Sequence, residues 1–240
     1  MHYISIFSTV IVVAFAAAVF NRYSKRGGIH LFLWGIGLVF YGLGTLSEAV
    51  MLFTFNPIIL KVWYFSGAMM TAAWLGQGTV HLLVRKRGVA SAMTAGLTGV
   101  SLLAFGLLAA APVTPAAALF DVSQPASVQY REILVRTTPL TILTILLNVY
   151  GTVTLVGGAL YSSYIFWRKH VLADRMVGNI LIAAGAMMPA MGGTFSRAGL
   201  PDWLYLSEFL GAILMFAGFM KATASQRVNK ELPVSSVSSH

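Results

Sequence analysis

The hydrophobic residues of this chain form long stretches that polar and charged residues separate. Seven stretches contain about 18 or more mostly apolar residues, and a helix of about that length crosses the hydrocarbon core of a bilayer. None alternates apolar and polar residues as a barrel strand does. We therefore predict an all-α membrane protein, a bundle of seven transmembrane helices. The predicted spans are residues 3–20, 31–53, 62–84, 89–108, 140–167, 177–195 and 203–220.

The basic residues predict the orientation of this bundle. Twelve of the 16 lysines and arginines follow the first, third, fifth and seventh stretches, which end on the same side of a membrane. Cytoplasmic loops carry an excess of such residues. We therefore expect a multi-pass protein of the plasma membrane, with its N-terminus outside and its C-terminus in the cytoplasm. The four remaining basic residues, on the outer side, are Lys61, Arg131, Arg136 and Arg197.

Composition supports a membrane protein and excludes other classes. The chain is 58% hydrophobic and 10% charged, which is outside the range of soluble domains. Its net charge of +9 could indicate nucleic-acid binding. However, most of the basic residues lie on one side of the predicted membrane, and membrane topology explains this excess, so we expect no nucleic acid as a partner. The chain has no cysteine, which excludes disulfides and thiolate metal sites.

No motif predicts an enzyme, a cofactor or a metal site. The sequence contains no HExxH, GxSxG or P-loop pattern and no spaced group of carboxylates. His30, His81 and His170 lie at the cytoplasmic ends of the stretches, which is too shallow for a bis-histidine haem. We expect a protein that is not an enzyme and holds neither cofactor nor metal.

Two further features concern domain organisation. Residues 1–223 form the predicted seven-helix domain, and the polar, serine-rich residues 224–240 are predicted to be a disordered cytoplasmic tail. The external segment 109–138 is the longest connection, and its residues 127–136 predict a short amphipathic helix. That helix would be either a connector or a lid over an external cavity.

Glycines recur at heptad spacing in several stretches. Gly178, Gly185 and Gly192 share one face of the sixth stretch, and Gly211 and Gly218 share one face of the seventh. Such stripes let helix backbones approach closely. They predict packing within the chain or, alternatively, the face of a homodimer.

Two carboxylates lie inside the apolar stretches and are the main functional candidates. Glu48 and Glu208 both lie about 8–12 Å below the outer boundary, and both share a helix face with small residues. An ionised group in the hydrocarbon region is costly unless it is protonated, paired or hydrated, so it marks a functional site by default. We expect both side chains to point into the bundle.

The predicted ligand-binding residues surround this pair. Two interpretations remain open: an outward-facing polar pocket for a small ligand or ion, or glutamates that only fix packing by bonding a tyrosine or pairing with Arg197. Gln77, deeper in the third stretch, is either part of a polar track or an interhelical hydrogen-bonding group. The candidate set is Glu48, Glu208, Arg197, Asn148, Tyr41, Tyr205 and Gln77.

One segment resembles a known family. The stretch from Trp34 through Glu48 to Lys61, Val62, Trp63 and Tyr64 is similar to the seven-transmembrane N-terminal sensor modules of bacterial histidine kinases and cyclases. The resemblance covers about a fifth of the chain, and it implies a sensory role. Those proteins continue into a signalling domain, whereas this sequence continues into a short polar tail, so the resemblance implies signalling through a partner subunit.

These observations predict a non-enzymatic sensory or ligand-binding module, or an accessory subunit of a membrane complex. The alternative is a small transporter or channel that moves a proton or small solute past the same two glutamates. Expected partners are the lipid bilayer, a protein bound through the cytoplasmic loops, a second copy of the chain, and a small molecule that the sequence does not identify.

Overall fold

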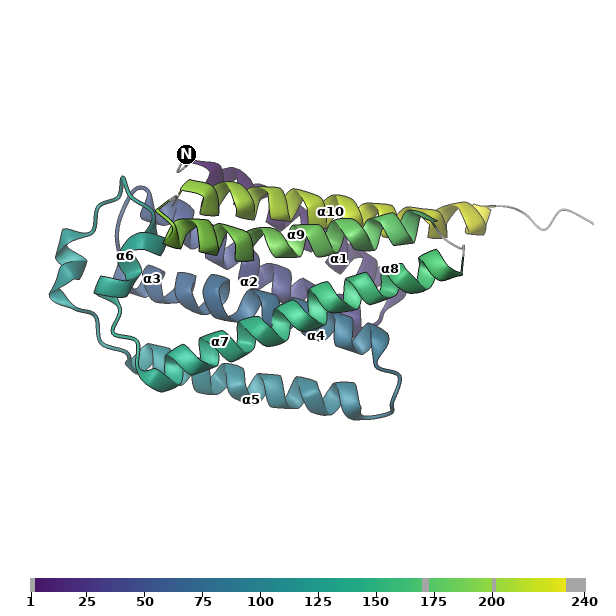
Figure 1. The fold of residues 1–240 in the computed structure, drawn as a ribbon, viewed down its shortest axis with the longest axis horizontal. Helices are drawn as coiled ribbons and strands as arrows, with labels where there is room; N and C mark the ends of the chain where they lie inside the picture. The colour runs from purple at the N-terminus through teal and green to yellow at the C-terminus, as the bar shows by residue number, and fades with distance from the viewer. Residues whose placement is uncertain (1–2, 170–172, 200–201, 232–240) are drawn as a thin grey trace, which may run out of the picture.

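The computed structural model describes residues 3–169, 173–199 and 202–231, and these ranges contain helices and no strand (Figure 1). The predicted all-α class is confirmed. The elements are α1 Ile4–Arg26, α2 Ile29–Met51, α3 Pro57–Trp63, η1 Tyr64–Met70, α4 Thr71–Leu83, α5 Val89–Ala110, η2 Pro115–Leu119, α6 Ala126–Ile133, α7 Thr138–Thr152, η3 Val153–Gly157, α8 Gly158–Arg168, α9 Ala173–Arg197 and α10 Asp202–Glu231. Helices α3, η1 and α4 form one continuous rod of membrane length, and α7, η3 and α8 form another. The middle element of each rod is a π-helix.

In the described residues, six helices or continuous rods are long and apolar enough to cross a membrane. The chain is therefore a multi-pass membrane protein. The six are Ile4–Arg26, Ile29–Met51, Pro57–Leu83, Val89–Ala110, Thr138–Arg168 and Trp203–Ala224.

The sixth predicted stretch, residues 177–195, lies in α9. This helix has 25 residues and packs along α10, but it is not among the six helices or rods that are long and apolar enough to cross a membrane, so the seventh span is not confirmed. Helix α10 follows and continues past residue 224, where the predicted tail begins, to Glu231. The rest of the predicted tail, residues 232–240, lies outside the described residues.

The rods run side by side, so their connections gather at two ends (Figure 1). One end carries α6 and the beginning of the chain, and we call it the α6 end. The opposite end carries the connections after α1, α4 and α8, and we call it the basic end. The basic side chains that follow these helices include Arg26, Arg85, Lys86, Arg87 and Lys169.

Glycines bring α9 and α10 into close contact. A Cβ atom at Gly185 would lie 2.7 Å from the carbonyl oxygen of Gly211, and one at Gly178 would lie 2.6 Å from that of Gly218. Any larger side chain would push the helices apart. The prediction that these stripes serve packing within the chain is confirmed.

A second close approach joins α2 to the π-helix η1. A Cβ atom at Gly44 would lie 2.9 Å from Cα of Gly67. The wider π turn leaves carbonyl groups that side chains satisfy: Thr71 Oγ1 donates to the carbonyl of Ser66 at 2.8 Å. Because π turns inside α-helices occur often at functional sites, η1 is a point of interest.

The long segment between α5 and α7 folds onto the α6 end of the bundle. The predicted amphipathic helix is confirmed as α6, Ala126–Ile133. Its last residue, Ile133, is 2% exposed, and the next residue, Leu134, is 1% exposed and pairs with Val113 in an isolated bridge. This burial fixes α6 across the ends of the neighbouring helices.

Candidate functional site

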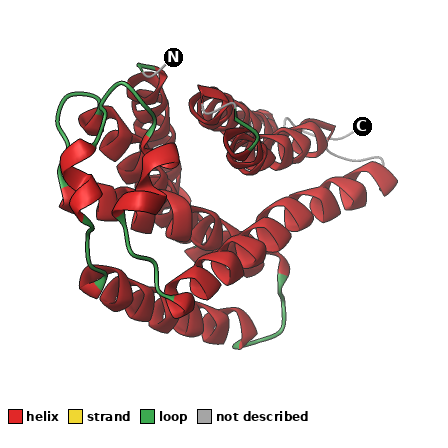
Figure 2. Ribbon diagram, turned by 60° about the vertical axis from the view of Figure 1, so that its left-hand side comes forward, coloured by secondary structure: helices red, strands yellow, loops and turns green. Residues whose placement is uncertain are grey.

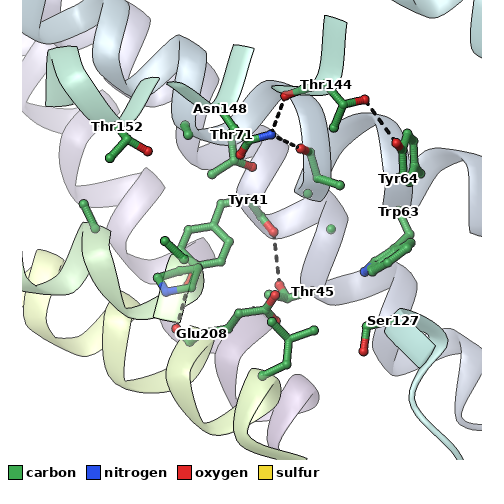
Figure 3. A pocket seen from close by; sticks show the side chains of 18 of the residues that line it. Tyr41, Thr45, Trp63, Tyr64, Thr71, Ser127, Thr144, Asn148, Thr152 and Glu208 are labelled. Atoms are coloured by element: carbon green, nitrogen blue, oxygen red, sulfur yellow. Dashed lines mark hydrogen bonds between the residues drawn. The ribbon is translucent and has the colours of Figure 1, made fainter. Parts of the chain in front are cut away.

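A cavity of about 480 Å³ extends from α6 into the bundle (Figure 3). It lies between the α9–α10 pair on one side and α2, the α3–η1–α4 rod and α7 on the other. Its deep end is apolar and is formed by Leu75, Leu155 and Met215. The polar lining consists of Tyr41, Thr45, Trp63, Tyr64, Thr71, Ser127, Tyr130, Arg131, Arg136, Thr141, Thr144, Asn148, Thr152, Thr194 and Glu208.

The cavity exists because the α9–α10 pair stands apart from α7. Figure 2 shows two helices packed side by side, next to the C-terminus, that are separated from the long rod below them. Helix α9 packs against η3 and α8, the inner half of that rod. Towards the α6 end, Thr144 and Asn148 of α7 and Ala190 and Thr194 of α9 line the space between the two helices.

Glu48 lies next to the cavity and is 2% exposed. Its Oε1 accepts a hydrogen bond from Trp63 Nε1 at 2.8 Å, and Trp63 itself lines the cavity. Its Oε2 is buried and has no hydrogen-bond partner. A buried carboxylate oxygen without a donor is costly, so this atom needs a proton, a cation or a ligand donor.

Glu208 lies in the wall of the cavity, near the start of α10. The carboxyl groups of Glu48 and Glu208 are within hydrogen-bonding reach of each other. Two ionised carboxylates have no hydrogen to share, so such a contact is stable only with a proton or a cation between them. The structure therefore brings together the two residues that sequence patterns single out.

Tyr41 fixes the helix that carries Glu208. Its hydroxyl donates to the backbone carbonyl of Glu208 at 2.6 Å (Figure 3), and its side chain is 5% exposed. The tyrosine thus bonds the main chain of α10 and leaves the carboxyl group of Glu208 available to the cavity.

Asn148 holds the opposite wall in place. Its Nδ2 donates to the carbonyl of Ala68 in η1 at 2.7 Å and to that of Thr144 at 2.8 Å (Figure 3). Tyr64 and Thr144 form a further hydrogen bond of 3.1 Å between η1 and α7. One carbonyl group and one hydroxyl group of the π-helix η1 thus join it to α7, and the two elements form neighbouring walls of the cavity.

The rim at the α6 end is basic and aromatic. The guanidinium groups of Arg131 and Arg136 lie 5.8 and 5.2 Å from the ring centroid of Tyr130. That ring in turn lies 5.4 Å from Trp63 and 5.6 Å from Tyr64. Sequence reasoning did not select this rim, although a lid formed by the amphipathic segment was one of its two interpretations.

Two further predicted residues are Tyr205 and Arg197. Tyr205 is 3% exposed in α10 and is not among the described residues that line the cavity. Arg197 ends α9, and its side chain lies outside the described part of the chain.

Gln77 belongs to a separate polar cluster nearer the basic end. Its Nε2 donates to the carbonyl of Ala90 at 3.0 Å and to Thr94 Oγ1 at 2.8 Å, while its Oε1 accepts from the hydroxyl of Tyr150. His81 Nε2 is 2.8 Å from the same Thr94 oxygen. These are interhelical contacts among α4, α5 and α7, and Gln77 is not among the described residues that line the cavity.

The described residues contain no group of three histidine, aspartate or glutamate side chains that could hold a metal ion. Comparisons with family models, with curated proteins and with solved structures found no match to this chain. The geometry of the cavity is therefore the basis on which a function can be assigned.

Proposed function

We propose that this protein is a sensory or ligand-binding membrane module, or an accessory subunit of a membrane complex, that binds a small polar molecule in the cavity beneath α6. The observation that carries the proposal is the pair Glu48 and Glu208. The first has a buried oxygen without a donor, and the second lies in the cavity wall beside it. A bound molecule that donates a hydrogen bond or a positive charge would satisfy both.

The size and lining of the cavity support this role. A volume of about 480 Å³ lies within the range of small-molecule sites, which usually combine apolar walls with a few placed polar groups. Here hydroxyl groups of Thr71, Thr144 and Thr152 line one side. Thr71 and Thr144 donate their hydroxyl hydrogens to backbone carbonyls within the protein, and their oxygens can still accept hydrogen bonds from a polar occupant.

The distribution of charge supports an outward-facing cavity. Basic side chains gather at the end opposite α6, which the positive-inside rule assigns to the cytoplasm. With seven spans, including α9, the N-terminus and the α6 end then face outwards from a plasma membrane. A partner protein would bind at the basic end, through the connection between α4 and α5 and the connection between α8 and α9.

Transport is the second candidate, and one observation ranks it lower. A transport path needs polar groups across the full membrane, but the cavity ends on Leu75, Leu155 and Met215. Beyond them the Gln77 cluster has its hydrogen bonds made within the protein. The same two glutamates would serve either function at the outer half.

A substitution that fills the cavity tests the proposal. Ala190 of α9 is an exposed residue of the cavity wall, so Ala190→Phe adds bulk there and removes no polar group. We expect a screen of amino acids, amines, organic acids and sugars by thermal shift to find a compound that stabilises the wild type and not this variant. Ala95→Phe, on an exposed face of α5, is the matched control and should retain the shift. A compound that stabilises Ala190→Phe as strongly as the wild type would place binding elsewhere.

Reconstitution distinguishes sensing from transport. We expect proteoliposomes to bind the compound without accumulating it inside. Uptake that Ala190→Phe abolishes and Ala95→Phe preserves would instead favour the transporter.

A further inference from the structure

We propose that the ligand is a small zwitterion whose positive group binds between Glu208 and Glu48 and whose negative group binds at Arg131 and Arg136. This inference rests on the proposed function, because it names the chemical class that the same cavity takes.

The glutamate pole of the cavity favours a positive group. Glu208 lines the cavity, and its carboxyl group is within hydrogen-bonding reach of that of Glu48, whose Oε2 is buried and without a donor. An ammonium group offers several N–H donors and one positive charge, so it can bond both carboxylates and relieve their repulsion. The aromatic side chains of Trp63, Tyr64 and Tyr41 also line the cavity, and aromatic rings attract a cation through their faces.

The outer pole requires a negative group. Arg131 and Arg136 both line the cavity, and both guanidinium groups lie close to the ring of Tyr130. Among the described side chains, no carboxylate lies within ion-pairing distance of either arginine. Guanidinium groups bind carboxylates and phosphates through paired N–H donors. A simple cation is disfavoured at this entrance, because it would have to pass two positive charges.

The separation of the poles selects among zwitterions. Arg131 lies in α6, which crosses the mouth, whereas Glu208 lies six residues after the start of α10. At 1.5 Å per residue this places the carboxylate about 9 Å below the mouth. A zwitterion with a chain between its charges spans this depth better than glycine, whose charges are one carbon apart.

A series of ω-amino acids tests the inference on the full-length protein in detergent or nanodiscs. The probes are glycine, 4-aminobutyrate and 6-aminohexanoate, with butylamine and butyrate as analogues that keep one charge each. We expect the longer zwitterions to bind, measured by calorimetry and thermal shift. Each single-charge analogue should bind about ten-fold more weakly, since it loses one charge-assisted contact.

Variants of each pole separate the two contacts. Glu208→Gln should abolish the preference for 4-aminobutyrate over butyrate, and Arg136→Gln should abolish its preference over butylamine. Glu132→Gln, on α6 but not among the described cavity-lining residues, should leave both preferences unchanged. Because Arg136 lies outside the helical core, its variant remains informative if Glu208→Gln does not fold.

The outcomes are distinct. Equal binding of zwitterions and single-charge analogues, or unchanged preferences in both variants, would overturn the zwitterion. A different result is that the whole series of ω-amino acids fails to bind while a compound of another chemical class binds to the wild type and not to Ala190→Phe. In that case the zwitterion proposal is wrong and the proposed ligand-binding function stands. If no class of compound binds, both proposals fail.

Discussion

Trp63 donates its indole N–H to Oε1 of Glu48 at 2.8 Å, and this bond joins the end of α3 to the last turns of α2. The same indole lines the cavity and packs its ring against Tyr130 of α6. A buried carboxylate is therefore connected through one aromatic side chain to the helix that covers the cavity. A group bound at Glu48 and a movement of α6 would both act on Trp63.

Two substitutions of Glu48 should have opposite effects on stability. Glu48→Gln keeps an acceptor for Trp63 and removes a buried charge, so we expect the free energy of unfolding to be equal or higher. Glu48→Leu leaves the indole N–H without an acceptor and should cost roughly 1–3 kcal/mol. Unfolding in detergent measures both values. A Leu variant as stable as the Gln variant would contradict the importance of this bond.

The approach of Gly44 to Gly67 should be intolerant of a methyl group. In Gly44→Ala, the new Cβ would lie 2.9 Å from Cα of Gly67, so two helix backbones must separate. We expect a loss of roughly 1–3 kcal/mol, as for overpacked cores. Gly96→Ala on α5 is the control, because a Cβ there meets no atom within 4 Å. An equal effect at both positions would show that helix propensity, and not packing, decides the result.

Removing the hydroxyl of Tyr41 should loosen α10. Tyr41→Phe keeps the ring and loses the 2.6 Å bond to the backbone carbonyl of Glu208, at an expected cost of about 1 kcal/mol. Tyr161→Phe removes the hydroxyl of a residue that is 58% exposed on α8 and should have no measurable effect. Thermal unfolding of the two variants side by side measures the difference. Similar melting temperatures would contradict a role for this bond in holding the helix.

Spin labels should report a wider range of distances across the cavity than across the α9–α10 contact. Because the chain has no cysteine, labels attach only at introduced sites. Ile142 of α7, Met191 of α9 and Leu210 of α10 are exposed and suit labelling. We expect a broad distribution for Ile142→Cys with Met191→Cys and a narrow one for Met191→Cys with Leu210→Cys, measured by pulsed electron resonance. Equally narrow distributions would show that α7 and the α9–α10 pair form one rigid unit.

The candidate site was only partly predictable from sequence. Carboxylates in apolar stretches identified Glu48 and Glu208, because the cost of charge in a bilayer depends on depth, which residue counting gives. Arg131 and Arg136 were placed in the predicted amphipathic helix but not among the site residues, since nothing in their local pattern shows whether that helix is a connector or covers a cavity. Gln77 shares the polar character of the site, but its partners on α5 and α7 are distant in sequence.

The sequence by itself determined the helical class, the membrane class and the presence of glycine stripes on the helices. Apolar length, backbone hydrogen bonding and heptad spacing are properties of neighbouring residues, and they act before any tertiary contact forms. The tertiary structure alone decided that Glu48 meets Glu208 and Trp63, and that α7 diverges from α9 to leave a cavity. Those relationships depend on how rigid helices cross, and the crossing is set by contacts between residues far apart along the chain.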